Sequence, residues 1–98
     1  MRAPCVYIVT NFYNGTLYVG VTSNLAQRVW QHREKTTDGF TKRYGLSRLV
    51  WHETHETMES AIGREKQIKR WNRAWKVRLI EEMNPSWSDL YEEIAQFG

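Results

Sequence analysis

The sequence predicts an α+β domain in which helices pack on a small antiparallel sheet. Two short runs rich in β-branched and aromatic residues, "CVYIVTN" and "LYVGV", stand on either side of an Asn-Gly dipeptide, the strongest short-range signal for a β-hairpin. From Thr57 onward apolar residues recur at helical spacing. One further strand between these regions gives the order ββαβααα, a three-stranded antiparallel sheet flanked by helices. At 98 residues the chain is predicted to form one domain, residues 1–98.

The elements of the first half follow from local composition. Strands are predicted over residues 5–11 and 17–21, a helix over 25–35, a polar loop over 36–47 and a third strand over 48–56. Ser23 or Asn24 is expected to cap the helix, because either side chain can accept a hydrogen bond from a backbone N–H of its first turn. The third strand segment, "RLVWHETHE", alternates apolar and polar residues after its apolar start, as a half-buried strand does.

The second half is predicted to contain three helices. Asn84-Pro85 is expected to end the middle one, which covers residues 74–83, because the residue before a proline disfavours helical geometry. The last helix is short and falls within residues 86–97. Thr57 is expected to cap the first of these helices and Ser86 or Ser88 the last, and a break in the helical pattern is expected at or near Asn72.

Composition excludes several classes of protein. No run approaches the roughly 18 apolar residues that a membrane-spanning helix needs, so no membrane association is expected. The N-terminal segment lacks a signal-peptide pattern, and its short apolar run fits a strand better. The single cysteine, Cys5, excludes an internal disulfide and a cysteine-rich metal site, and its apolar surroundings favour a small core residue over a nucleophile. The cytoplasm, a reducing compartment, is the expected location.

The basic residues are concentrated in one window. Residues 64–78 hold seven of the 14 Lys and Arg residues with a single acid, and aromatic residues lie among them. Residues 79–98 hold five acids and no Lys or Arg. This pattern is typical of a surface that binds an anionic partner. It is equally typical of a solvated helix face, and composition does not decide between the two.

Arg28 and His32 occupy an unusual place on the predicted first helix. At about 100° per residue, the arc expected to face the sheet holds Leu25, Ala26, Val29 and Trp30. Arg28 and His32 fall together at the edge of this arc, one turn apart, so their polar groups project to the same place. Taken alone, the pair is best explained as an arginine lying over apolar surface and a half-buried, hydrogen-bonded histidine.

Glu65 lies on the helix that is predicted to begin after Thr57. The apolar stripe of this helix is formed by Met58, Ala61, Ile62 and Ile68, and Glu65 falls within it. A buried carboxylate needs a partner, because desolvation of the charge costs several kcal/mol. A salt bridge to Arg28 or Lys69 would supply one. A hard cation would also do so, since Mg²⁺ is often held by one or two carboxylates together with phosphate and water.

The segment "HETHE" (52–56) is not predicted to bind a metal. It lacks the i, i+4 histidine spacing of the helical HExxH motif, and on a strand His52 and His55 do not share a face. A solvated edge of the sheet is the favoured interpretation.

With these residues identified, the chain resembles the GIY-YIG family, in particular its stand-alone, single-domain branch. The two motifs lie on adjacent strands joined through Asn-Gly and correspond to Cys5-Val6-Tyr7 and Tyr18-Val19-Gly20. The helix that follows carries the pattern S-N-L-x-x-R-x-x-x-H, formed by Ser23, Asn24, Leu25, Arg28 and His32. The resemblance covers nearly the whole chain, and the combined order and spacing of the motifs with Arg28 and Glu65 make it specific.

The resemblance implies hydrolysis of phosphodiester bonds in DNA that depends on Mg²⁺ or Mn²⁺. The implied catalytic residues are Tyr7 and Tyr18 from the motifs, Arg28 at the scissile phosphate, His32 one turn on, and Asn84. Asn84 matches either an asparagine of the family or a helix-ending cap. Glu65 matches the single carboxylate that binds the metal.

These residue types suit phosphodiester hydrolysis. Arg28 can bind two phosphate oxygens bidentately, and a metal on Glu65 can act as a Lewis acid for the leaving oxygen. Tyr18, activated within the site or relaying through His32, would take the proton of the attacking water, although free tyrosine titrates near ~10. Two departures from the family pattern bear on activity. Cys5 replaces the first glycine, which is tolerated unless the position needs positive φ, and Val21 stands where some repair nucleases have lysine.

The favoured function is therefore a metal-dependent DNA endonuclease, structure-selective and acting in DNA repair or recombination. The alternatives are a nucleic-acid-binding domain with weak or lost cleavage, and a protein-interaction module, which the acidic tail suits. DNA is the expected partner, and RNA is not excluded. The candidate nucleic-acid contacts in the basic window are Lys66, Lys69, Arg70 and Arg73, with Lys66, Arg70 and Arg73 expected on one outer helix face.

Overall fold

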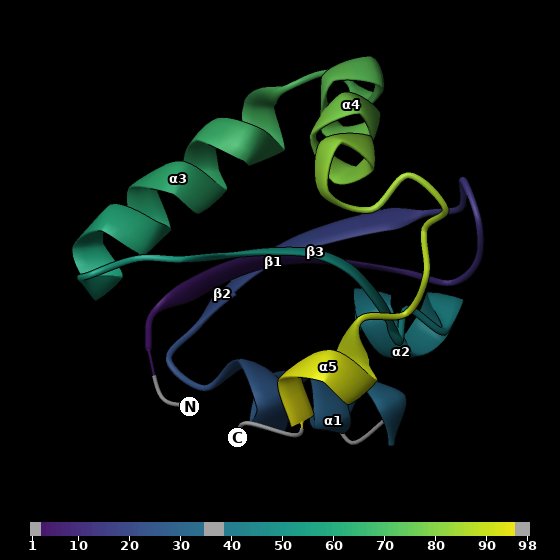
Figure 1. The fold of residues 1–98 in the computed structure, drawn as a ribbon, viewed down its shortest axis with the longest axis horizontal. Coiled ribbons are helices and arrows are strands. Elements are labelled where there is room, and N and C mark those ends of the chain that lie inside the picture. The colour runs from purple at the N-terminus through teal and green to yellow at the C-terminus, as the bar shows by residue number, and fades with distance from the viewer. Residues whose placement is uncertain (1–2, 35–38, 96–98) are drawn as a thin grey trace.

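The fold is a three-stranded antiparallel sheet in the order β2-β1-β3 with helices on both faces, which confirms the predicted fold class. The structure is a computed structural model that describes residues 3–34 and 39–95. Its elements are β1 (Cys5–Thr10), β2 (Leu17–Thr22), α1 (Leu25–Arg33), α2 (Phe40–Tyr44), β3 (Arg48–Thr54), α3 (Met58–Arg70), α4 (Arg73–Met83) and α5 (Tyr91–Ala95). Figure 1 shows α3 and α4 on one face of the sheet and α1 and α5 on the other. In the described part of the chain, no helix has the length and apolar character needed to cross a bilayer.

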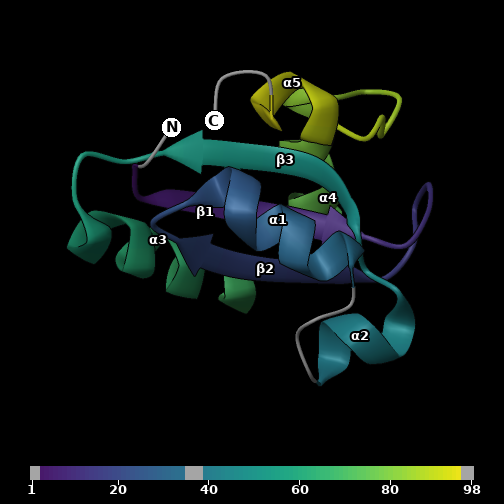
Figure 2. The same cartoon turned by 90° about the horizontal axis from the view of Figure 1, so that it is seen from below.

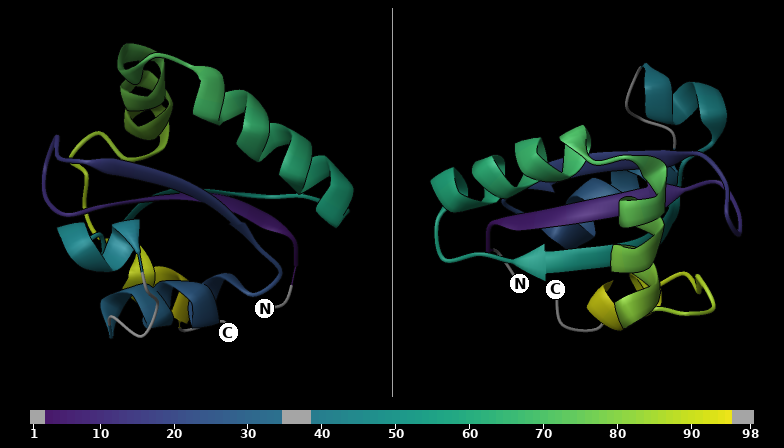
Figure 3. Two further views of the ribbon diagram at one scale, coloured as in Figure 1. Left: turned by 180° about the vertical axis from the view of Figure 1, so that it is seen from behind. Right: turned by 90° about the horizontal axis from the view of Figure 1, so that it is seen from above.

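The central strand, β1, separates two apolar cores. All six of its residues are buried, because both of its faces are covered. Val6 and Ile8 point into the core beneath α3 and α4, whereas Cys5, Tyr7 and Val9 point into the core beneath α1 and α5. Figure 3 shows α3 over β1 and β2, and α4 over β3. The buried strand predicted from "CVYIVTN" is thus the layer on which both sets of helices pack.

Polar side chains cap the starts of α1, α3 and α4; the caps of α1 and α3 were predicted, and that of α4 lies where a break was predicted. The side-chain oxygens of Asn24, Thr57 and Asn72 each accept a hydrogen bond from the backbone N–H three residues later. The last helix differs from the prediction, since it begins only at Tyr91. Its first N–H donates to Asp89 rather than to one of the two predicted serines.

One helix, α2, lies within the segment predicted to be a loop. The observed order is therefore ββααβααα. Gly39 and Gly45, on either side of α2, both have positive φ, a conformation that glycine adopts without a steric penalty. A helix of five residues is too short to carry a periodic apolar pattern, which explains why sequence analysis missed it.

The Asn14-Gly15 signal marks the β1–β2 hairpin, but the connection is longer than a two-residue turn. β1 ends at Thr10 and β2 begins at Leu17. The residue with positive φ is Asn14, at 56°. Gly15 is required for space, because a Cβ atom there would overlap the side-chain oxygen of Asn11.

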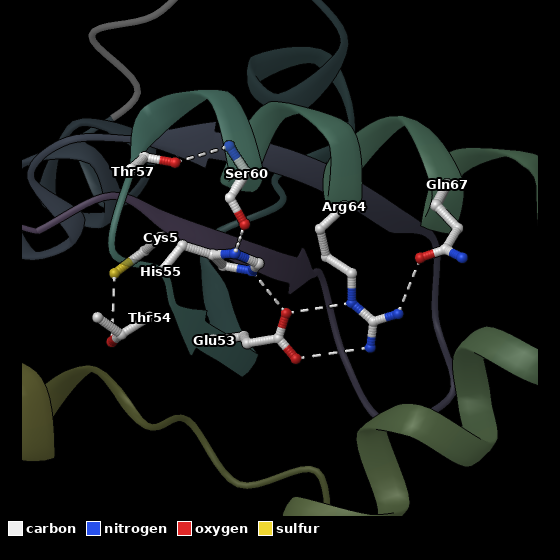
Figure 4. A network of polar contacts seen from close by, with 8 residues as sticks. All are labelled: Cys5, Glu53, Thr54, His55, Thr57, Ser60, Arg64 and Gln67. Atoms are coloured by element: carbon white, nitrogen blue, oxygen red, sulfur yellow. Dashed lines mark hydrogen bonds and ion pairs between the residues drawn. The ribbon is translucent and has the colours of Figure 1, made fainter.

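Glu53 joins the end of β3 to α3, as Figure 4 shows. Its carboxylate accepts hydrogen bonds from His55 Nε2 at 2.7 Å and from Arg64 Nε at 3.1 Å. With its proton on Nε2, the His55 ring can accept at Nδ1 from Ser60 Oγ, which lies 2.7 Å away. Glu53 and His55 of "HETHE", which was predicted to form a solvated edge, therefore link β3 to α3.

A β-bulge in β3 explains the position of Asn84. The register between β1 and β3 shifts between Ile8 and Val9, so Val50 is an extra residue on β3. The Val50 carbonyl accepts a hydrogen bond from Asn84 Nδ2 at 3.2 Å. The same amide donates to Ser88 O at 2.8 Å and accepts from Ser88 N at 3.0 Å. Asn84 therefore links the end of α4, the bulge and the following loop.

Replacement of Asn84 by alanine is expected to lower the free energy of unfolding by about 1–3 kcal/mol, because it leaves the buried Val50 carbonyl and the Ser88 N–H without their partners. Chemical denaturation measures this. Ser86→Ala, an exposed change in the same loop, is the control and should fall within about 0.5 kcal/mol of wild type. Unchanged stability with lost activity would instead favour the catalytic role predicted for Asn84.

Candidate active site

Tyr7 is the buried centre of a polar cluster on the α1 side of the sheet. It lies on β1 opposite Gly20 of β2, and only 1% of its surface is exposed. A Cβ atom on Gly20 would lie 2.5 Å from both Cζ and Oη of Tyr7. Only glycine therefore lets the Tyr7 ring lie across β2, and this is the physical reason for the glycine of the second motif.

Two side chains of α1 converge on the Tyr7 hydroxyl. Arg28 Nε donates a hydrogen bond to Tyr7 Oη at 3.3 Å, and His32 Nε2 lies 3.0 Å from the same oxygen. Arg28 also donates through Nη1 to Gln31 Oε1 at 3.2 Å, which helps to fix the guanidinium plane. Arg28 and His32, which lie one helical turn apart, were predicted to project to the same place. They do, and both contact the hydroxyl of Tyr7.

The buried face of α1 is narrower than predicted. Leu25, Val29 and His32 are its buried residues, whereas Trp30 is 48% exposed. At about 100° per residue, His32 lies beside Leu25 and Val29, whereas Trp30 lies at the opposite edge of the predicted arc. The buried face is therefore centred on Leu25, Val29 and His32, and Trp30 falls outside it.

Burial keeps the centre of the cluster neutral near pH 7. It raises the pKa of Tyr7 to about 12, although hydrogen bonding to Arg28 acts in the opposite direction. Burial, assisted by the charge of Arg28, lowers the pKa of His32 to about 4. Burial alone would lower the pKa of Arg28, but the Tyr7 and Tyr18 hydroxyls stabilise its charged form and raise that pKa overall.

The two nitrogens of the His32 ring differ in their surroundings. If Nε2 accepts the Tyr7 O–H, the ring proton of the neutral imidazole lies on Nδ1. Nδ1 is buried and has no hydrogen-bond partner among the described residues. An unpaired buried donor costs about 1–3 kcal/mol. Tyr7 is therefore the hydrogen-bond partner that the described residues give this imidazole.

The helix α3 adds a carboxylate and an ammonium group to this cluster. Lys69 Nζ lies 3.1 Å from Glu65 Oε2 and 5.8 Å from the centre of the Tyr18 ring. The Glu65 side chain is 14% exposed, and its charge contributes to the raised pKa of Tyr7. Of the two ion-pair partners considered from the sequence, Lys69 is the one that Glu65 contacts.

The site is assembled from both helical layers at the β2 edge of the sheet. Figure 2, seen from the α1 side, shows α3 extending beyond β2. The Tyr18 ring, on β2, lies 6.4 Å from the Tyr7 ring and 5.8 Å from the His32 ring. Arg28 and Lys69 supply two cations against the one carboxylate of Glu65. This balance favours a bound anion such as a phosphate group.

Glu65 is chemically suited to a hard cation. Its ion pair with Lys69 uses one carboxylate oxygen, Oε2. No group of three or more metal-ligating His, Cys, Asp or Glu side chains occurs in the described ranges, so a cation here would take its other ligands from water and phosphate. Mg²⁺ is commonly bound in this way.

Other predicted site residues lie elsewhere. Asn84 bonds the backbone of β3 and its own loop, and none of these partners belongs to the cluster. Arg73 Nη2 donates to the carbonyls of Asn14 and Gly15 at 2.8 and 2.7 Å, so this arginine holds the β1–β2 hairpin. Lys66 and Arg70 are exposed on the outer side of α3. Nothing in the sequence pattern distinguished Arg73 from its basic neighbours.

The substitution of Cys5 for the first motif glycine introduces no backbone strain. Within residues 3–34 and 39–95, positive φ at non-glycine positions is limited to Asn14 and Trp87. Cys5 is 4% exposed, and its Sγ lies 3.7 Å from Thr54 Oγ1. The position therefore does not need the conformational freedom of glycine.

Residues 3–78 match the family model described as the GIY-YIG catalytic domain, a span that contains the whole cluster from Tyr7 to Lys69. Domains that match this model are typically nuclease domains. The chain belongs to the GIY-YIG family.

The relatives are small proteins of the same kind. The UPF0213 proteins of Staphylococcus aureus strains Mu3 and Mu50 are each 38% identical over 82 residues, which cover 84% of this chain and 99% of the relative. The solution NMR structure of a UPF0213 protein from Bacillus halodurans is 24% identical and matches with a TM-score of 0.55 over 88% of this chain and 90% of that one. These matches show the stand-alone form of the fold, and the relatives' names assign no activity.

The low pKa of His32 predicts a component of stability that is lost in mild acid. The pKa of His32 is about 6.5 in the unfolded chain and about 4 in the folded protein. Between pH 6.5 and pH 4 the unfolded chain therefore binds a proton that the folded protein does not, so lowering the pH through this range destabilises the fold. The loss attributable to His32 is expected to be about 3 kcal/mol at pH 4. His32→Phe should remove it in denaturation series from pH 7 to pH 4.

The pKa of His52 is also lowered by burial, so the comparison is best made in a His52→Phe background. If His32→Phe leaves the pH dependence of stability unchanged there, the imidazole is not held neutral in the fold.

Proposed function

We propose that this protein is a metal-dependent DNA endonuclease that hydrolyses phosphodiester bonds. The observation that carries the proposal is the convergence of Arg28, Tyr18 and Glu65 at one edge of the sheet in a chain of the GIY-YIG family. Preorganised cations stabilise the charge that develops on a phosphate during its cleavage. Contacts to phosphates carry no sequence information, so we propose that the enzyme selects DNA by structure, as in repair or recombination.

Arg28 is the proposed phosphate-binding residue. Its hydrogen bonds to Tyr7 and Gln31 hold the guanidinium in one orientation, and burial of Tyr7 behind it keeps that restraint rigid. A fixed guanidinium can bind two phosphate oxygens at once. Because the pKa of Arg28 is raised, the group stays charged through the reaction.

The two tyrosines are proposed to have different roles. Tyr7 keeps its proton at neutral pH because its pKa is about 12, so it acts as a hydrogen-bonding support for Arg28. His32 contacts Tyr7 through a hydrogen bond and Tyr18 through ring packing, which favours a positioning role for the imidazole over a proton relay from Tyr18. Tyr18, on the edge strand and less buried, is the residue proposed as the general base: its hydroxyl would first lose its proton to solvent, and the phenolate oxygen would then take the proton of the attacking water.

Glu65 is the residue proposed to hold Mg²⁺ or Mn²⁺. When bound, the ion would supply Lewis acidity for the leaving oxygen. Lys69 lies beside Glu65 and faces the Tyr18 ring. We expect it to supply the positive charge that a lysine after the second motif gives some repair nucleases, since Val21 occupies that position here.

The direct test is a cleavage assay on linear, nicked, flapped and four-way-junction DNA with Mg²⁺, with Mn²⁺ and with chelator. Cleavage of at least one branched substrate is expected with either metal, and none with chelator. DNA binding without cleavage under every condition would favour the alternative, a nucleic-acid-binding domain that has lost the chemistry.

Glu65→Gln is expected to abolish cleavage and metal binding while the fold is retained. The change keeps the size of the side chain and removes the charge that a hard cation requires. Titration with Mn²⁺ followed by calorimetry measures metal binding, and circular dichroism checks the fold. Glu59→Gln, at an exposed position of the same helix, is the control. Cleavage by Glu65→Gln at the wild-type rate would make Glu65 only an ion-pair partner of Lys69.

Arg28→Ala is expected to lower kcat by roughly 10²-fold or more with little change in DNA affinity, because Arg28 is proposed to act mainly on the transition state. Arg33→Ala is the matched control, since it removes the same charge from the same helix but from an ion pair with Asp89. Parallel losses of affinity and turnover would mean that Arg28 only binds the DNA backbone.

A further inference from the structure

Two tryptophan rings meet at the junction of α3 and α4. Trp71, which ends α3, and Trp75, in the first turn of α4, make an edge-to-face contact with ring centres 6.0 Å apart. Trp71 packs against the core, whereas Trp75 is 52% exposed. The Arg64 guanidinium lies 5.3 Å from the Trp71 ring and is held by Glu53 and Gln67, as Figure 4 shows. Trp71 is therefore a fixed support for a solvent-exposed ring.

Two hollows have this tryptophan pair in their linings. One, of about 560 Å³, is lined by Gly63, Lys66, Gln67, Arg70, Trp71 and Trp75. The other, of about 330 Å³, is lined by Arg64, Trp71, Trp75, Arg78, Leu79 and Glu82. The larger hollow combines two cations with no acidic side chain in its lining, whereas the smaller one includes a carboxylate. The larger hollow is thus the one suited to an anion.

The cations of the larger hollow connect it to the candidate active site. Successive residues of α3 are separated by about 100° around the helix axis, so residues four apart form stripes. One stripe, Glu65 and Lys69, belongs to the site. The next is Lys66 and Arg70, and the one after it is Gln67 and Trp71. A nucleic-acid backbone that runs from the site across α3 would therefore pass the exposed side chains of Lys66 and Arg70 before it reaches Trp71.

We propose that Trp71 and Trp75 form a stacking platform for unpaired nucleotides, and that the substrate is DNA with a single-stranded segment next to the cleaved phosphate. The proposal rests on the proposed nuclease function and names its substrate class. An exposed, supported aromatic ring stacks on any base, because every base has a π face, and adjacent Lys and Arg bind the backbone. Bases within a duplex are already stacked on one another, so the platform selects unpaired ones.

The test measures binding in the presence of chelator, so that its result does not depend on cleavage. Two fluorescent probes of equal length are compared, an oligodeoxythymidylate and an abasic oligonucleotide with the same phosphates. Trp75→Ala is expected to weaken binding of the first probe about tenfold, within the range known for base stacking, and to leave binding of the abasic probe unchanged. Quenching of tryptophan fluorescence by the first probe should fall in the same variant.

Trp30→Ala is the matched control, because it removes a tryptophan of similar exposure from α1. It should bind both probes as wild type does. Lys66→Gln/Arg70→Gln should reduce the salt slope of log K by up to about 1.4 on either single strand, since each lost phosphate contact contributes about 0.7. Wild-type binding of the oligodeoxythymidylate by Trp75→Ala would overturn the proposal, and so would an equal loss on the abasic probe. Failure of the protein to cut any DNA would overturn the proposed function but not this binding result.

Discussion

The candidate site depends on the close approach of the Tyr7 ring to the backbone of Gly20. Any Cβ at position 20 would occupy the space of the Tyr7 hydroxyl. The ring would then have to leave β2, and both of its contacts on α1, to Arg28 and His32, would be lost together. Displacements of about 1 Å are sufficient to impair a site whose chemistry depends on orientation. Gly20 thus affects the positions of Arg28 and His32 through the position of one phenol.

The two edge strands of the sheet, β2 and β3, are covered by different parts of the chain. An exposed strand edge can pair with other chains, and folded proteins usually cover it. At β3 the segment before α5 does so, because Leu90 N donates to Leu49 O at 2.8 Å and Asp89 accepts from Leu49 N at 3.2 Å. At β2 the helices α1 and α3 bring their polar groups together instead. The C-terminal segment stabilises one edge, and the other edge carries the candidate site.

The sequence predicted the sheet, the caps of α1 and α3, and the meeting of Arg28 with His32, because each follows from a local pattern of residues. The pairing of Arg28 with His32 follows from helical geometry. The structural use of Arg73 and Asn84 could not be predicted, since their partners are backbone carbonyls of a hairpin and a bulge far away in the chain. The exposure of Trp30 was missed for a similar reason. Leu25 and Val29 are buried as the periodicity predicted, but the sequence does not show how far the covered face extends toward Trp30.

The assembly of the site from opposite layers has a consequence for when it can exist. Arg28 and His32 dock with the helices on one face of β1, and Glu65 docks with those on the other. A nascent or partly opened chain that has formed a single layer holds only half of the groups. Local opening of α3 alone would separate the carboxylate from the guanidinium without unfolding the rest. Under the proposed function, DNA cleavage therefore requires a chain in which both helical layers have formed.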